Sequence, residues 1–296
     1  MAKRGPARTA RHVCEAAAAH VFFGLLGALP VGWASALGAV LGGSIGPMLP
    51  VHRQGLDNLA RALPELSPAE VRRCARRMWR HLGRVAAEYP HLHRFSVDAP
   101  GGRVELVGRA YLEEAKRSPT GGIFFSGHIG NWEIAALTLE QGGIPATVVY
   151  RAANNPIVDR MISRIRGAVM QHLVPKGHDG TRELVRTLGA GGHAALLVDQ
   201  KLNTGIPVPF FGRDAMTAPA VGTLALRYDC PVWPVRVERL TGASFRVTVY
   251  PKLAMPEEGT REERIRAITV AINRTLEDWI RDRPAQWLWL HRRWLD

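Results

Sequence analysis

The chain has 296 residues, of which 46% are hydrophobic and 22% charged. This composition excludes a disordered or low-complexity protein and allows one large domain or two ordinary ones. The formal net charge of +13 predicts anionic partners, such as a nucleic acid, a membrane surface, or an acidic protein or substrate. Three widely spaced cysteines without a CxxC or zinc pattern argue against a disulfide framework.

The N-terminal part contains a long segment without charged side chains. Residues 16–51 include no Asp, Glu, Lys or Arg, and such a stretch is long enough for a helix that crosses a membrane. Prolines and glycines interrupt it, so a tilted, broken or interfacial insertion is equally compatible. The basic residues from Lys3 to Arg11 would keep the preceding end in the cytoplasm. Two alternatives stay open: a signal peptide cleaved near Ala34-Ser35-Ala36, and a buried helical hairpin.

A helix start is predicted at Ser67-Pro68-Ala69-Glu70, which combines a capping box with proline at the first helical position. Apolar residues then recur on one face of the helix, and arginines cover the rest. The apolar positions are Val71, Cys74, Ala75, Met78, Trp79 and Leu82, and the arginines are Arg72, Arg73, Arg76, Arg77 and Arg80. A basic amphipathic helix suits a membrane interface, and an ordinary surface helix packed on a core has the same pattern.

After about residue 100, apolar runs of strand length alternate with helical stretches. The expected strands are residues 122–125, 146–150, 194–198, 232–237 and 245–250, the last two close enough to form a hairpin. A second capping box, Thr260 to Glu263, opens a helix that ends before Pro284. We therefore expect an α/β fold with a mixed central sheet flanked by helices. A membrane-associating helical region, residues 1–100, precedes the α/β domain, residues 101–296, and the two could form one unit.

The motif with the clearest chemistry is His128-Ile129-Gly130-Asn131-Trp132-Glu133. The spacing between histidine and acid recurs elsewhere in the chain, but only His128 follows an apolar strand, lies between glycines and precedes a helix start. Asn131 is a suitable N-cap and places Glu133 in the first helical turn, where the helix dipole favours a carboxylate. A carboxylate that orients a neutral imidazole forms a general-base dyad. The alternative is a structural His–Glu pair that closes a βα turn.

No serine in the chain has the setting of a nucleophile. Gly42-Gly43-Ser44-Ile45-Gly46 matches the pattern G-x-S-x-G, but it lies in the apolar N-terminal segment without a preceding strand. The remaining histidines are scattered and suggest no metal site. The sequence therefore supplies no nucleophile that competes with His128 as the candidate catalytic residue.

Several blocks, taken in order, make the chain resemble the lipid A late acyltransferases, the lauroyl/myristoyl branch of the lysophospholipid acyltransferase superfamily. The blocks are Asn58 to Pro64, His128 to Glu133, Val149 to Pro156, Val198 to Lys201 with Gly205 to Gly212, and Trp287 to Trp294. The resemblance covers about residues 15–296 and implies a glycerolipid acyltransferase-like fold. Some relatives carry Asp-His-Asp where this chain has Asp199-Gln200-Lys201.

The resemblance implies acyl transfer from an acyl carrier protein thioester to a hydroxyl of a lipid A precursor, without metal or cofactor. It implies that His128 is the general base and that Glu133 orients it. Substrate contacts are implied at Asn131, Arg151, Asp199, Gln200 and Arg292, and Arg293 is a further candidate for contact with an anionic group of donor or acceptor. The donor protein is acidic, so a basic enzyme would attract it electrostatically. The implied location is the inner membrane, with the active site on the cytoplasmic side.

Other functions remain as alternatives to this interpretation. The acceptor could be another lysolipid or glycolipid, including a phosphatidylinositol mannoside. A non-enzymatic lipid-binding protein would use the same basic and apolar surfaces, and a serine-type lipid hydrolase would need a better nucleophile than Ser44. Nucleic acid is not expected as a partner, because the sequence contains no zinc finger, RRM or similar signature.

Overall fold

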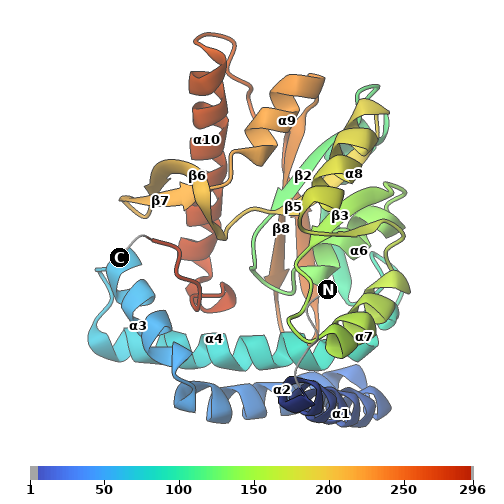
Figure 1. Ribbon diagram of the computed structural model, residues 1–296, viewed down its shortest axis with the longest axis vertical. Helices are drawn as coiled ribbons and strands as arrows, with labels where there is room; N and C mark the ends of the chain where they lie inside the picture. Colours follow the sequence, from blue (N-terminus) through green and yellow to red (C-terminus); the bar gives the residue numbers. More distant parts are fainter. Residues whose placement is uncertain (1–5, 295–296) are drawn as a thin grey trace.

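A seven-stranded sheet forms the centre of the computed structural model, which describes residues 6–294 (Figure 1). The basic residues Lys3 and Arg4 therefore lie outside the described residues. The strand order is β1-β9-β8-β2-β5-β3-β4, and all neighbours are parallel except the antiparallel pair β8–β9. The strands are β1 (Val104–Val107), β2 (Gly122–Ser126), β3 (Ala146–Tyr150), β4 (Leu173–Pro175), β5 (His193–Leu197), β8 (Val232–Arg239) and β9 (Phe245–Val249).

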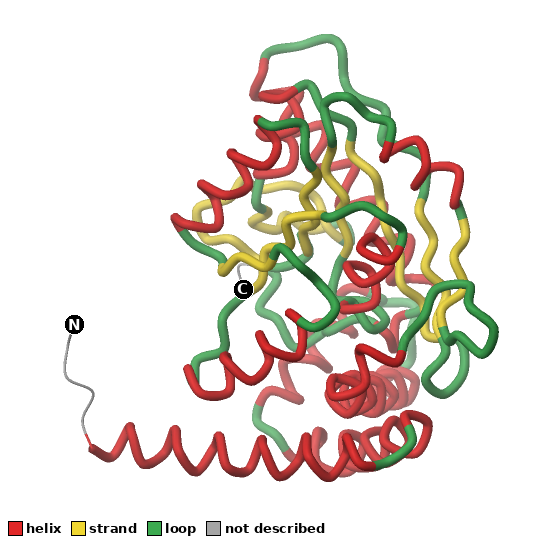
Figure 2. Tube along the Cα trace, turned by 90° about the vertical axis from the view of Figure 1, so that its right-hand side faces the viewer, coloured by secondary structure: helices red, strands yellow, loops and turns green. Residues whose placement is uncertain are grey.

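Helices cover both faces of this sheet, and alternate residues of β2 face the two layers. Ile123 and Phe125 pack with one group of helices, and Phe124 packs with the other. The first group is α8 (His178–Gly189), α9 (Ala220–Tyr228) and α10 (Arg261–Asp282); the second includes α5 (Arg109–Lys116) and α6 (Glu133–Gln141). Because both faces are covered, β2 is buried along its whole length, as expected for a central parallel strand. The tube in Figure 2 shows the strands enclosed between helices.

The expected strands are confirmed, including the hairpin formed by β8 and β9. Strands β1 and β4 were not predicted, and neither was the separate antiparallel pair β6 (Lys201–Phe210) and β7 (Arg213–Thr217). The segment of β6 contains Gly205, Pro207 and Pro209, residues that are depleted in strands, so its composition hides the strand.

Four helices precede the sheet: α1 (Pro6–Ala28), α2 (Val31–Ile45), α3 (Val51–Ala62) and α4 (Pro68–Glu88). The capping box of α4 is present, with Glu70 N–H donating to Ser67 Oγ, and that of α10 is formed in the same way by Thr260 and Glu263. The predicted apolar face of α4 is buried apart from the half-buried Leu82, and its five predicted arginines are exposed. Helix α4 is therefore a surface helix whose apolar side contributes to the core.

Helix α2 packs closely along α4, and these two helices lie with α1 at one end of the molecule (Figure 1). A Cβ atom at Gly38 would lie 2.3 Å from the carbonyl oxygen of Gly83, so the helices can approach this closely only because both positions are glycine. Within the described residues, the stretch Val31–Met48 is long and apolar enough to cross a membrane, yet 33% of it is buried inside the protein. Tertiary packing thus occupies one side of this helix.

The two regions that the sequence separates near residue 100 share one hydrophobic core. Leu59 and Met78 of the N-terminal helices belong to the same buried cluster as Ile123 of β2 and Trp289 near the C-terminus. Asn58 Nδ2 also donates hydrogen bonds to the carbonyl oxygens of Trp289 and His291, both at 2.7 Å. These contacts attach the helical region to the C-terminal segment beside the site described next.

Candidate active site

The ends of two neighbouring strands bring His128 and Asp199 together. Strands β2 and β5 are parallel, and their register pairs Ser126 with Leu197. His128 and Asp199 each follow two residues later, so they emerge side by side at the carboxyl edge of the sheet. Ligand sites of open α/β sheets form at this edge. The expected position of His128, in the loop between β2 and α6, is confirmed.

Asp199 is completely buried and surrounded by donors. The ring Nδ1 of His128 lies 2.8 Å from Asp199 Oδ1, and the backbone N–H of His128 donates to Oδ2 at 2.9 Å. Trp287 Nε1 donates to Oδ2 at 2.7 Å. Burial alone would raise the pKa of Asp199, but its interactions with the ring and the backbone N–H of His128 outweigh burial and hold that pKa well below its usual range. Asp199 is therefore ionised, and it favours the tautomer of His128 with the proton on Nδ1.

The other ring nitrogen of His128 is left as an acceptor. Gln200 Nε2 lies 3.3 Å from His128 Nε2 and 3.3 Å from His291 Nε2, so one amide group can donate to both rings. Burial, with the nearby His128 and Arg151, lowers the pKa of His291 to about 4 despite the attraction of Asp199. His291 is thus neutral at neutral pH. His128 Nε2 has the lone pair that a general base requires.

Glu133 does not make the contact with His128 that the sequence predicted. Its Oε1 accepts hydrogen bonds from Tyr89 Oη at 2.5 Å, Trp132 Nε1 at 3.0 Å and Arg166 Nη2 at 2.6 Å, and its Oε2 accepts from Arg166 Nε at 2.9 Å. The carboxylate on the His128 ring is that of Asp199. As the first residue of α6, Glu133 is directed toward α7 (Pro156–Gly167), which carries Arg166. Trp132, which donates to Glu133, has its ring 5.1 Å from the His128 ring.

Asn131 lies inside the protein rather than on the surface of a binding site. Its side chain is 0% exposed. Asn131 Oδ1 accepts from the backbone N–H of Glu133 at 3.3 Å, and Nδ2 donates to Glu88 at 2.9 Å. The N-cap residue of α6 is Trp132, one position later than the sequence predicted. The predicted direct contact of Asn131 with substrate therefore has no support in this geometry.

A cavity of about 530 Å³ opens beside His128, within the range of ligand-binding pockets. Its wall combines apolar side chains from the sheet and helices with a few polar groups near His128. The apolar residues include Phe124, Leu139, Val148, Met170, Leu173, Leu184, Ala195 and Val221. Such a cavity suits an apolar chain, since each methylene group that leaves water contributes about 0.8 kcal/mol.

The remaining predicted substrate residues differ in position. Arg151 and Gln200 line the cavity, and Arg151 is exposed at its edge. Arg292 is exposed on the surface and is not among the described residues that line the cavity. The adjacent Arg293 was also a candidate for binding an anion. It is instead 0% exposed and donates to Thr217 Oγ1 at 2.8 Å, so it has a structural role.

Asp199, Trp287 and His291 show what the sequence analysis missed. Asp199 was assigned to substrate binding, and its contact with His128 was not foreseen. The available signal was that His128 and Asp199 each lie within three residues of the end of an expected strand. Within residues 6–294, no group of three or more His, Cys, Asp or Glu side chains is placed to hold a metal ion. Ser44 lies within α2, outside any strand–turn–helix setting.

Comparison with known proteins gives the family of the chain. The chain matches the family described as bacterial lipid A biosynthesis acyltransferase over residues 7–296. It is 24% identical over 244 residues to the lipid A biosynthesis myristoyltransferase of Escherichia coli, which covers 81% of this chain and 73% of that protein. It is 23% identical over 194 residues to a lipid A biosynthesis acyltransferase of Haemophilus influenzae, covering 64% of this chain and 58% of that relative. Because the family match includes nearly the whole chain, and both strand ends that carry His128 and Asp199, the chain belongs to the bacterial lipid A biosynthesis acyltransferase family.

Proposed function

We propose that the protein transfers a fatty acyl chain from an acyl carrier protein thioester to a hydroxyl group of a lipid A precursor. His128 Nε2 takes the hydroxyl proton while the hydroxyl oxygen attacks the thioester carbonyl. The C–S bond then breaks, the new ester leaves, and the proton passes from His128 to the thiolate. Asp199 stabilises the imidazolium that exists between these two proton transfers. No covalent acyl-enzyme is required.

The observation that carries this proposal is the contact between His128 Nδ1 and Asp199 beside an apolar cavity that His128 lines. A base and an adjoining compartment for a hydrocarbon chain are the two features that acyl transfer to a lipid hydroxyl needs. Arg151 and Lys176 also line this cavity and are exposed, so they are placed to contact anionic groups of the donor or acceptor. Family membership supports the same chemistry.

Product analysis by mass spectrometry tests the proposal. The purified protein is incubated with acyl carrier proteins that carry acyl chains of different lengths and with lipid A precursor. We expect a new ester on the lipid and one preferred chain length, set by the cavity. Release of free fatty acid without an ester would indicate a hydrolase, and binding without turnover would indicate a lipid-binding protein. Transfer only to another glycolipid would correct the acceptor.

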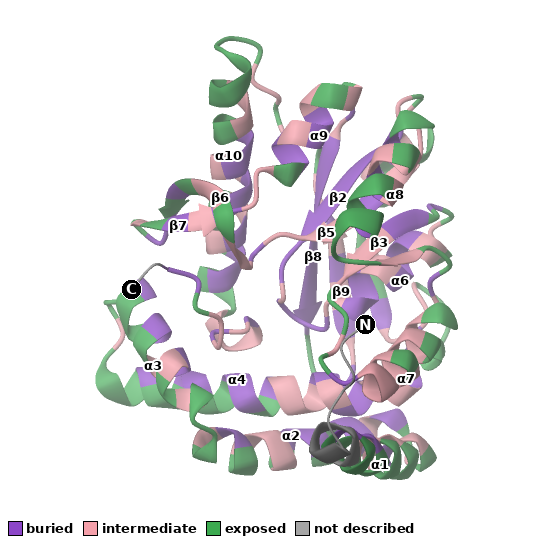
Figure 3. Ribbon diagram, in the orientation of Figure 1, coloured by how far each residue is buried: buried purple, intermediate pink, exposed green. Residues whose placement is uncertain are grey.

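We further propose that α1 and α2 lie in the membrane interface, with the active site on the cytoplasmic side of the inner membrane. Large apolar side chains are exposed mainly on these helices, the turn that follows and the first residue of α3. They are Val13, Val21, Leu25, Trp33, Leu37, Val40, Ile45, Met48, Leu49 and Val51. Figure 3 shows that much of α1 and α2 is exposed. The opposite side of α2 packs on α4, so an interfacial position fits this helix better than a crossing. Asn155, at the start of α7, donates to the carbonyl oxygen of His12 in α1, which connects this surface to the cavity region.

Removing apolar contact from this surface should release the protein from membranes. The double variant Trp33→Glu, Met48→Glu changes side chains that are 74% and 81% exposed. Burial of a large apolar side chain contributes about 1.5–3 kcal/mol, so we expect vesicle binding to weaken at least about 10-fold. Co-sedimentation with phosphatidylethanolamine–phosphatidylglycerol vesicles measures it. The control Val107→Glu, Leu240→Glu changes exposed apolar residues elsewhere and should bind normally. Equal binding by the two double variants would contradict the proposal.

A further inference from the structure

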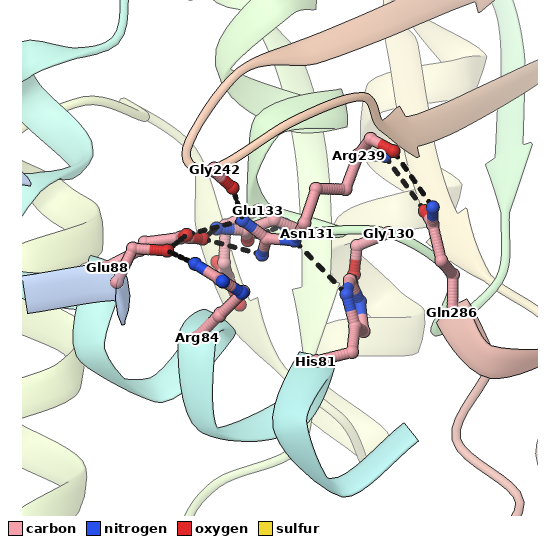
Figure 4. Close-up of polar contacts among 10 residues, drawn as sticks. His81, Arg84, Glu88, Gly130, Asn131, Glu133, Arg239, Gly242 and Gln286 are labelled. Atoms are coloured by element: carbon pink, nitrogen blue, oxygen red, sulfur yellow. Dashed lines mark hydrogen bonds and ion pairs between the residues drawn. The ribbon is translucent and has the colours of Figure 1, made fainter. Parts of the chain in front are cut away.

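The carboxylate of Glu88, at the end of α4, is 0% exposed and lies beside the loop that carries His128 (Figure 4). Arg239 forms a two-point ion pair with it: Nη1 lies 2.5 Å from Oε1, and Nη2 lies 2.8 Å from Oε2. Ser35 Oγ donates to Oε1 at 2.7 Å, and Asn131 Nδ2 donates to Oε2 at 2.9 Å. Each carboxylate oxygen therefore has two donors, as a buried charge pair requires if it is to be stable.

The guanidinium of Arg239 also orients His81. Arg239 Nε donates to His81 Nδ1 at 3.1 Å, so the ring proton of His81 must lie on Nε2. His81 Nε2 then donates to the carbonyl oxygen of Gly130 at 2.9 Å. Burial, with the charge of Arg239, lowers the pKa of His81 to about 3, so the ring remains neutral. The ion pair thereby fixes which nitrogen of His81 faces the loop.

Gly130 and Asn131 are thus hydrogen-bonded to the buried network of His81, Glu88 and Arg239. The C-terminal segment also contacts Gly130. The N–H of Gly130 donates to the carbonyl oxygen of Gln286 at 3.1 Å. The side chain of Gln286 pairs with both backbone groups of Arg239, at 2.8 and 2.9 Å (Figure 4). Gly130 has φ +59, and a Cβ there would lie 2.3 Å from the carbonyl oxygen of Val237. The loop can take only a narrow range of positions.

We propose that His81, Glu88 and Arg239 are positioning residues that hold the loop of His128 so that its Nδ1 meets Asp199 and its Nε2 meets the substrate hydroxyl. None of these three side chains is among the described residues that line the cavity. They therefore act on His128 through Gly130 and Asn131. His128 lies two residues before Gly130. A displacement of about 1 Å at a reacting group can cost about 100-fold in rate. This inference rests on the proposed acyl transfer.

The experiment compares His81→Leu with His81→Gln. Leucine removes the donor to Gly130, whereas glutamine can accept from Arg239 through Oε1 and donate to Gly130 through Nε2. We expect His81→Leu to lower kcat about 10- to 100-fold with KM for both substrates nearly unchanged. His81→Gln should retain kcat within about 3-fold of the wild type, because it restores the same donor and acceptor. Steady-state kinetics on the folded fraction, with thermal melting as a check, measures both.

A purely structural role would lower the melting temperature of both variants and leave kcat per folded molecule unchanged, which would overturn the proposal. Equal loss of kcat in the leucine and glutamine variants would overturn it too. If His81→Leu does not fold, His81→Asn replaces it, because the shorter amide of asparagine cannot reach both Arg239 and Gly130. A wild-type kcat in His81→Asn would also overturn the proposal. His128→Ala distinguishes failure of this inference from failure of the proposed function. If His128→Ala transfers acyl chains as fast as the wild type, the proposed function fails, whatever the kinetics of the His81 variants.

Discussion

Replacing His128 with alanine is expected to lower the rate of acyl transfer at least about 100-fold, because the lipid hydroxyl then has no base to accept its proton. Folding and membrane association should persist, since the loop keeps its backbone contacts to Asp199 and the C-terminal segment. The rate is measured with acyl carrier protein thioester and lipid A precursor, and the fold by circular dichroism and thermal melting.

Two further variants make this result specific to the imidazole base. His128→Asn keeps an amide that can donate to Asp199 but has no basic nitrogen, so it should be as inactive as alanine. His93→Ala, at an exposed histidine of the helical turn Tyr89–Arg94, should transfer at the wild-type rate. Normal transfer by His128→Asn would exclude His128 as the base.

The second large effect is expected for Asp199→Asn, which should reduce kcat by about 100- to 10,000-fold with little change in KM. The neutral amide cannot stabilise the imidazolium, and its NH₂ group facing Nδ1 would favour the unproductive tautomer of His128. Asparagine has nearly the same shape, so Trp287 Nε1 can still donate to it. Steady-state kinetics for both substrates separates the effect on kcat from any effect on KM.

Glu133→Gln is the matched comparison, because the sequence alone would predict the opposite ranking. Glu133 holds Arg166 and Tyr89 rather than His128. Its replacement should lower thermal stability, since it leaves the largely buried Arg166 with a weaker partner. We expect kcat to fall by no more than about 10-fold, because Glu133 influences His128 only through the ring of Trp132. If Glu133→Gln were inactive and Asp199→Asn active, Glu133 and not Asp199 would be the residue that orients His128.

Local signals in the sequence were sufficient for five of the nine strands in the described residues and for the starts of two helices. The capping boxes at Ser67 and Thr260 act within four residues, so they mark the starts of α4 and α10 wherever those helices pack. The apolar runs that became β2, β3, β5, β8 and β9 show the continuous hydrophobicity of buried strands. His128 was found because strand, glycine and helix start adjoin in a few consecutive residues.

Which side of the N-terminal apolar segment packs against the protein could be decided only by the tertiary structure. Its hydropathy fits a crossing helix, an interfacial helix and a buried hairpin equally well. Gly38 gives the segment a flat side, but glycine is also common in membrane-spanning helices. Gly38 in α2 contributes to close helix packing because Gly83, 45 residues later in α4, lies directly against it.

The sequence by itself determined that an imidazole stands at a strand-to-helix corner of an α/β protein, because that information lies in adjacent residues. Only the tertiary structure decided which carboxylate meets it. Asp199 is 71 residues from His128, and the two touch because β2 and β5 are neighbours in register. Glu133, five residues away, turns with α6 toward Arg166. Strand order depends on how the whole chain packs, and no local periodicity encodes it.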